Sequence, residues 1–340
     1  MTDTPILIWG AGAIGGTIGA FLARAGRDVL FLDRVQDHVD AINETGMRIS
    51  GPVAEFTTPA RAVTPETLEG AFDTVFLCVK GQDTLGAVEA LTPHLPADGC
   101  VVSFQNGLNE TVIAEMIGAQ RTVGAFINFG ADYHGPGHIF YGGRSAVVVG
   151  EIDGTVTDRA RRIHEALLDF DDAAVLTDNI WGHLWSKMGY VSLLFATALV
   201  DATIDEVIAS KDHQPLHEAL AREVMSVAAA KGLKLEPFDP FDPYGFTADA
   251  KPERTRAAFG KMVDYRTRSE KKYSGMWRDI AVRKRKTEVN DLLVPMVREA
   301  EALGVPVPLN TRMIELVYDI EEGRRPQSWE TLDVLKAAMG

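Results

Sequence analysis

The chain has 340 residues, of which 46% are hydrophobic, enough to build two domains with cores of their own. Its formal net charge of −14 leaves no overall basic field, which argues against a protein that binds nucleic acid or an anionic membrane surface. The N-terminus lacks the pattern of a signal peptide and the longest apolar run, Met188 to Val200, is too short to span a bilayer, so we expect a cytoplasmic protein acting on small molecules.

The first predicted element is a buried strand, Ile6 to Trp9, which runs directly into the pattern Gly10-x-Gly12-x-x-Gly15. In this pattern the first glycine permits a tight turn, the second lets the backbone approach a pyrophosphate, and the third lets the next helix pack closely. A helix predicted from Ile14 to Arg24 would bring its positive N-terminal end to the same place. The alternative is a tight turn that binds nothing. We predict a dinucleotide site formed by Gly10, Gly12, Ala13, Ile14 and Gly15.

The next strand, Val29 to Leu32, ends in an acidic residue, Asp33. This acid lies near the distance from the glycine turn at which a carboxylate binds the adenosine ribose. We therefore add Asp33 to the predicted cofactor site.

Strand and helix signals go on alternating through the first half, which is typical of βαβ units and a mostly parallel sheet. The predicted helices are His38 to Glu44, Thr84 to Leu91 and Arg159 to Leu168. The predicted strands are Thr74 to Val79, Cys100 to Phe104 and Ala173 to Leu176, with a small hairpin from Met47 to Phe56. Three more strands, Thr122 to Phe129, His138 to Tyr141 and Ser145 to Val149, predict an antiparallel extension of the sheet around Gly135-Pro-Gly137.

Cys78 and Cys100 both lie inside these apolar strand-like runs. Two such cysteines are typical packing residues, so we expect neither a disulfide nor a metal site.

Polar residues follow two of the buried strands. Lys80 comes after the strand that begins at Thr74, and Asn106-Gly107 follow the strand that begins at Cys100. Ligands of open α/β sheets bind beyond the carboxyl ends of the strands, so both positions should face the cofactor or the substrate. The alternatives are a solvated lysine and an ordinary Asn-Gly turn.

From Asn179 onward the helical period dominates, and we predict two domains, residues 1–178 and 179–340. A helix beginning near Trp181 carries Lys187 within an apolar stripe that includes Leu184 and Val191. A lysine there is costly unless its ammonium reaches a cleft or a carboxylate. The alternative is a lysine that extends from the helix edge into water.

Two later segments of the helical half are informative. Residues Glu236 to Gly245 are rich in proline and aromatic residues and predict a loop, either a connector or a lid over the substrate. Thr287-Glu288 opens a helix that ends at Gly304, and Glu288 lies where the helix dipole favours a carboxylate. Its simplest role is that of a cap.

Taken together, these motifs resemble the ketopantoate reductase (2-dehydropantoate 2-reductase) family over nearly the whole chain. The resemblance rests on these segments: Gly10-Ala-Gly-Ala-Ile-Gly15, Lys80, Gln105-Asn106-Gly107, Leu184-Trp-Ser-Lys187, Ser274-Gly-Met-Trp-Arg-Asp279 and Thr287-Glu288. It implies an α/β chain with an N-terminal Rossmann-type dinucleotide-binding domain and an all-helical C-terminal domain of the 6-phosphogluconate dehydrogenase kind. It also implies an NAD(P)-dependent oxidoreductase of pantothenate biosynthesis, and we leave open a homodimer.

The resemblance implies a role for each matching residue. Lys187 would be the general acid, with Asn106 and Glu288 completing the catalytic set. Lys80, Asn106, Lys187, Ser274 and Glu288 would bind the substrate, a 2-oxo or 2-hydroxy acid. Asn106 would also lie near the nicotinamide, and Lys80 at the boundary of cofactor and substrate. An ammonium close to a carbonyl oxygen can stabilise its growing charge and donate the proton that the reduction needs.

Two departures bear on the substrate and the cofactor. Where the family carries two asparagines after the catalytic lysine, this chain has Val191 and Phe195, which favours a dehydrogenase of a different hydroxy acid as the alternative. Asp33 favours NAD, whereas Arg34 stands where family members place an arginine against the 2′-phosphate of NADP. We expect NAD or NADP, with a slight preference for NAD. A non-catalytic NAD(P) sensor is a further alternative.

Overall fold

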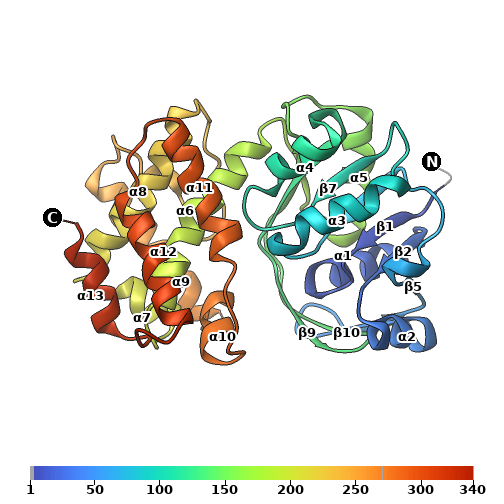
Figure 1. Cartoon of the computed structure of the whole chain (residues 1–340), viewed down its shortest axis with the longest axis horizontal. Helices are drawn as coiled ribbons and strands as arrows, with labels where there is room; N and C mark the ends of the chain where they lie inside the picture. Colours follow the sequence, from blue (N-terminus) through green and yellow to red (C-terminus); the bar gives the residue numbers. More distant parts are fainter. Residues whose placement is uncertain (1–3, 270, 340) are drawn as a thin grey trace. The chain divides into compact units, whose positions relative to one another are not determined.

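The computed structural model describes residues 4–269 and 271–339 of the chain. It divides into two compact units, Met1–Ile180 and Trp181–Gly340, which we call the N-terminal unit and the helical unit (Figure 1). The boundary expected from the sequence, between residues 178 and 179, lies just before this division.

An eight-stranded sheet forms the centre of the N-terminal unit, in the order β12-β11-β8-β7-β6-β1-β2-β5. Its strands are β1 (Ile6–Trp9), β2 (Val29–Leu32), β5 (Arg61–Val63), β6 (Thr74–Leu77), β7 (Cys100–Ser103), β8 (Thr122–Ile127), β11 (Val147–Glu151) and β12 (Val175–Leu176). All neighbours from β5 to β8 pair in parallel, and β11 is antiparallel to β8. The expected mostly parallel sheet is therefore confirmed.

Helices cover both faces of this sheet. They are α1 (Ala13–Arg24), α2 (Gln36–Thr45), α3 (Thr84–Leu91), α4 (Asn109–Ile117) and α5 (Asp158–Phe170). Ile8 of β1 belongs to the core on the side of α1 and α5, whereas Leu7 and Trp9 belong to the core on the side of α3 and α4. Because alternate side chains enter two different apolar cores, the central strands read as unbroken hydrophobic runs.

A second sheet of four strands corrects one sequence-based expectation. Its order is β4-β3-β10-β9, with β3 (Met47–Ser50), β4 (Phe56–Thr58), β9 (Gly130–Gly135) and β10 (His138–Gly143). The hairpin around Gly135-Pro-Gly137 therefore does not extend the main sheet; only β8 and β11 do so. The physical reason is aromatic packing, because Tyr141 of β10 contacts Phe21 of α1 and Phe129 edge-on, at ring distances of 5.8 and 5.6 Å. This packing holds the hairpin over α1.

The second unit contains the helices α6 to α13, as expected for an all-helical domain (Figure 1). They are α6 (Ile180–Ala198), α7 (Ile204–Ala209), α8 (Gln214–Ala230), α9 (Pro252–Arg268), α10 (Gly275–Ala281), α11 (Val289–Ala302), α12 (Pro308–Glu321) and α13 (Trp329–Ala337). A buried network joins three of them. Ser192 of α6 donates to Asn310 of α12 at 2.6 Å, and the Asn310 amide donates to Glu223 of α8 at 2.7 Å. No helix among the described residues is both long and apolar enough to cross a membrane.

The proline- and aromatic-rich segment after Glu236 packs into the helical unit. Phe241 and Phe246 are fully buried, and their rings stack at 5.1 Å. The backbone N–H of Glu236 donates to the hydroxyl of Ser186 on α6, at 3.1 Å. A segment whose rings are buried in this way is a connector held in the core rather than a lid.

Candidate functional site

Four neighbouring strands of the main sheet end at the same edge. Trp9 of β1 pairs with Leu32 of β2 and with Leu77 of β6, and Leu77 pairs with Ser103 of β7. The residues that follow these positions emerge side by side. The glycine turn, Asp33, Lys80 and Asn106 therefore lie along one edge of the sheet, where parallel α/β sheets bind ligands.

The glycine turn has the geometry that a pyrophosphate requires. Gly10 adopts φ +101°, a conformation that favours glycine. A Cβ on Gly15 would lie 2.1 Å from the carbonyl oxygen of Gly10, so only glycine lets α1 pack this closely. A Cβ on Gly12 would meet no described atom within 4 Å, which leaves open space beside the N-terminus of α1. The N–H groups of the first helical turn have no intrahelical partners, and they suit an anion in that space.

The carboxylate of Asp33 is fixed by the backbone. Its Oδ2 accepts the N–H of Ala11 at 3.1 Å and its Oδ1 accepts the N–H of Val35 at 3.0 Å. Each carboxylate oxygen can accept a further hydrogen bond, so a ribose diol remains a suitable ligand. The guanidinium of Arg34 is exposed and lies 3.3 Å from Asp83. The turn and Asp33 together fit the adenosine diphosphate half of a nicotinamide dinucleotide.

A buried amide network supports the turns that carry Lys80 and Asn106. Gln105 is 4% exposed and donates to the carbonyl of Val79 at 3.0 Å and to the hydroxyl of Thr84 at 2.7 Å. Thr84 donates to Asn109, whose amide donates to the carbonyl of Asn106 at 2.7 Å. The side chain of Asn106 is exposed. Gln105 is a supporting residue that sequence reasoning named only as part of a motif, although its place between a buried strand and an Asn-Gly turn was a usable signal.

Lys187 lies in the middle of α6 and is only 9% exposed. Its apolar neighbours one turn away, Leu184 and Val191, are 2% and 5% exposed, so the predicted apolar stripe is present. His183 precedes Lys187 by four residues, which puts it on the same helix face. Burial lowers the pKa of His183, so the imidazole beside Lys187 favours its neutral form. Burying an ammonium on an apolar face is costly unless it reaches a cleft or a polar partner.

Ser274 and Glu288 begin two other helices of the same unit. The hydroxyl of Ser274, 3% exposed, accepts the N–H of Trp277 at 3.1 Å and so caps α10. Its own proton remains available as a donor. Glu288 occupies the N-cap position of α11, yet its side chain makes no capping hydrogen bond. The hydroxyl of Thr287 accepts the N–H of Val289 instead, at 3.3 Å. Glu288 therefore holds the N-cap position expected for it, where the helix dipole favours a carboxylate, but it does not cap α11 through a side-chain hydrogen bond.

Both residues that stand in place of the family's two asparagines are buried. Val191 is 5% exposed, and Phe195 has no exposed surface at all. Neither side chain can hydrogen-bond a substrate hydroxyl. Phe195 belongs to the core of the helical unit.

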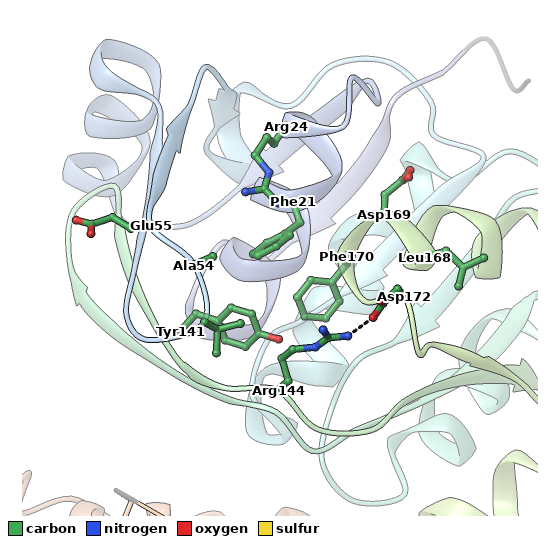
Figure 2. Close-up of a pocket in the computed structure, with 11 residues that line it drawn as sticks. Phe21, Arg24, Ala54, Glu55, Tyr141, Arg144, Leu168, Asp169, Phe170 and Asp172 are labelled. Carbon is green, nitrogen blue, oxygen red and sulfur yellow. Dashed lines mark hydrogen bonds and ion pairs between the residues drawn. The ribbon is translucent and has the colours of Figure 1, made fainter.

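A pocket of about 500 Å³ lies at the other end of α1 from the glycine turn (Figure 2). Phe21, Tyr141 and Phe170 form its apolar wall, and Arg144 at its rim pairs with Asp171 at 2.7 Å and with Asp172. Phe21 and Arg24, which line the pocket, belong to the last turn of α1, whereas the dinucleotide pattern ends in its first turn. None of the site residues expected from the sequence lines this pocket. No group of metal-ligating side chains was found among the described residues.

Comparison with known proteins gives a consistent picture. A family model described as ketopantoate reductase PanE/ApbA matches residues 6–154, and one described as its C-terminal part matches residues 179–321. A 2-dehydropantoate 2-reductase of Archaeoglobus fulgidus is 28% identical over 322 residues, covering 94% of this chain and 98% of that protein.

Solved structures agree on the fold. A PanE/ApbA family ketopantoate reductase from Ralstonia eutropha is 26% identical with a TM-score of 0.77, covering 94% of this chain and 99% of the other. D-mandelate dehydrogenase, in a complex with NADH and anilino(oxo)acetate, has a TM-score of 0.80 at 20% identity, with the same coverage.

Proposed function

Because the chain belongs to the ketopantoate reductase family and is an NAD(P)-dependent oxidoreductase, we propose that it reduces a 2-oxo acid such as ketopantoate to the 2-hydroxy acid. The observation that carries the proposal is the glycine turn, with open space at Gly12 and the fixed carboxylate of Asp33 beside it. The nicotinamide cofactor, when bound, supplies the hydride. The residues of the chain bind and orient the reactants and supply the proton.

Lys187 is the general acid of this proposal. As hydride reaches the carbonyl carbon, negative charge grows on the carbonyl oxygen. A lysine ammonium, protonated at neutral pH, stabilises this charge and then donates its proton to the oxygen. The low exposure of Lys187, 9%, supports this role, since an ammonium shielded from water interacts more strongly with a developing charge.

The remaining residues hold the substrate. Lys80, Asn106, Ser274 and Glu288 would bind the oxo acid, the role that the family resemblance implies for each. Asn106 is exposed on its turn. The hydroxyl of Ser274 still has its proton to donate, and Glu288 is half-buried at the start of α11. A carboxylate accepts a hydrogen bond from a substrate hydroxyl, as ketopantoate would offer.

The alternative is a dehydrogenase of another hydroxy acid. Val191 and Phe195 replace the amide side chains expected of a ketopantoate pocket. A site without these hydrogen-bond partners usually loses much of its specificity for a substrate that carries a hydroxyl. The similarity of fold to D-mandelate dehydrogenase is compatible with a bulkier, more apolar acid.

A panel of 2-oxo acids assayed with NADH and NADPH by absorbance tests both proposals. The panel contains ketopantoate, a short unbranched 2-oxo acid and an aromatic 2-oxo acid. Fastest turnover of ketopantoate supports the leading proposal, and fastest turnover of another acid supports the alternative. If the protein binds NADH or NADPH but reduces none of the acids, the sensor hypothesis replaces both. Light scattering on the same sample tests the homodimer, which we keep as a proposal.

A further inference from the structure

A buried histidine outside the predicted site contacts the glycine turn. His38, on α2, is 1% exposed, and its ring bridges two backbone groups that are far apart in the sequence. The N–H of Gly137 donates to Nδ1 at 2.8 Å, so Nδ1 carries no hydrogen. The ring hydrogen is therefore on Nε2, which donates to the carbonyl oxygen of Ala11 at 2.9 Å. Both ring nitrogens are used.

Both backbone polar groups of Ala11 are therefore hydrogen-bonded. The carbonyl accepts from His38, and the N–H donates to Asp33 at 3.1 Å. Ala11 is fully buried and lies between Gly10 and Gly12, the residues that turn the chain and face the open space. A Cβ on Gly16 would lie 2.8 Å from the Ala11 carbonyl oxygen, so this carbonyl is closely packed from the helix side as well.

The other end of the bridge is equally well fixed. Gly137 lies in the turn between β9 and β10, and its carbonyl accepts the N–H of Arg48 on β3 at 2.8 Å. The ring of Tyr133, on β9, packs edge-on against His38 at 5.2 Å. Figure 1 shows α2 beside the β9–β10 hairpin. The second sheet is thus connected through one imidazole to the glycine turn.

We propose that His38 is a positioning residue for the dinucleotide cofactor. It holds the Ala11 peptide so that Gly12 and the first turn of α1 keep the orientation a pyrophosphate needs. Through Gly137 it couples the β9–β10 hairpin to cofactor affinity. This inference rests on the proposed use of the glycine turn as the cofactor site.

Three substitutions in the full-length protein separate the two hydrogen bonds. His38→Phe keeps a ring against Tyr133 and loses both bonds. His38→Asn keeps an acceptor near the position of Nδ1, for Gly137, and loses the bond to Ala11. His38→Gln keeps a donor near the position of Nε2, for Ala11. The matched control is His134→Asn, because His134 lies on the same hairpin with an exposed side chain that stacks on Phe140.

Fluorescence titration with NADH and NADPH gives the dissociation constants, and steady-state rates give the Michaelis constants. We expect His38→Phe and His38→Asn to weaken cofactor binding about tenfold and His38→Gln about threefold or less. The turnover number at saturating cofactor and the KM for the 2-oxo acid should stay unchanged. Thermal melts of each variant without cofactor are measured in parallel. If the loss of cofactor affinity parallels the drop in melting temperature in all three variants, regardless of which hydrogen bond each variant keeps, then His38 has a structural role only.

A measurement on the wild-type protein keeps the inference testable if the variants do not fold. Since coupling is reciprocal, saturating NADH or NADPH should slow hydrogen exchange of the peptide that contains the Gly137 amide. Unchanged exchange there overturns the inference. The proposed function fails separately: wild-type protein that binds neither dinucleotide removes it, whereas normal binding by folded His38→Phe removes only the role of His38.

Discussion

Thr287 donates both its backbone N–H and its hydroxyl to the same oxygen of Glu321, with 2.7 Å to Oε1 in each case. This pair fixes the start of α11 without help from the side chain of Glu288. The start of α11 is thus held by Thr287 and Glu321, and substrate binding by Glu288 remains a proposal.

From the proposed substrate role of Glu288, we expect Glu288→Gln to impair substrate binding and leave the fold intact. Loss of a charge-assisted hydrogen bond to a substrate hydroxyl should lower kcat/KM by roughly 10- to 100-fold. Thermal unfolding should be nearly unchanged. The matched control, Glu321→Gln, should lower the melting temperature, because it weakens the two bonds from Thr287. A destabilised Glu288→Gln with normal kinetics would return Glu288 to a structural role.

Lys187→Ala removes the proposed general acid. We expect kcat to fall by roughly 10²- to 10⁴-fold, the usual contribution of a positioned proton donor. The dissociation constant for NADH or NADPH should change little, because the dinucleotide is proposed to bind the N-terminal unit. Lys231→Ala is the control, since this lysine pairs with Glu299 at 2.6 Å elsewhere in the helical unit. Turnover within a few-fold of the wild type would exclude Lys187 from the chemistry.

Asp33→Asn tests the cofactor preference. A carboxylate repels the 2′-phosphate of NADP and binds the free ribose hydroxyl of NAD. We expect the ratio of kcat/KM for NADPH to that for NADH to rise about tenfold, equivalent to roughly 1.4 kcal/mol. Asn keeps one acceptor oxygen, so it can accept the N–H of Ala11 or that of Val35 but not both. An unchanged ratio in Asp33→Asn, with a fall in NADPH use in Arg34→Ala, would mean that Arg34 governs the choice.

His217 should make the fold sensitive to mild acid. Its ring is fully buried on α8, neither ring nitrogen has a hydrogen-bond partner among the described residues, and burial lowers its pKa to about 4. An unfolded histidine has a pKa of about 6.5, so the unfolded chain takes up a proton that the native state resists. Stability is therefore lost as the pH falls from about 6.5 to about 4.

Urea unfolding at pH 7 and pH 5 measures this effect. The loss attributable to His217 at pH 5 should be about 2 kcal/mol. His217→Leu should reduce the difference between the two pH values by about that amount, whereas His134→Asn should not. Equal differences in the wild type and His217→Leu would show that the imidazole is not the titrating group.

The sequence alone predicted much of the N-terminal unit. The strands at Ile6, Thr74 and Cys100 could be read from their apolar runs, and the turn between β1 and α1 from the spacing of its glycines. The place of Lys187 in an apolar helix face also followed from the helical period alone. Each of these signals lies within one short stretch, since backbone propensity and side-chain periodicity are local properties.

What the tertiary structure decided are the pairings between distant stretches. The hairpin around Gly137 belongs to the second sheet because aromatic rings of α1 and β10 pack together. His38 bonds both Gly137 of this hairpin and Ala11 of the glycine turn. The capping of α11 by Thr287 depended on Glu321, one helix later. Such contacts depend on the packing and strand register of the whole unit. The sequence around either residue therefore carries no local pattern that predicts the contact.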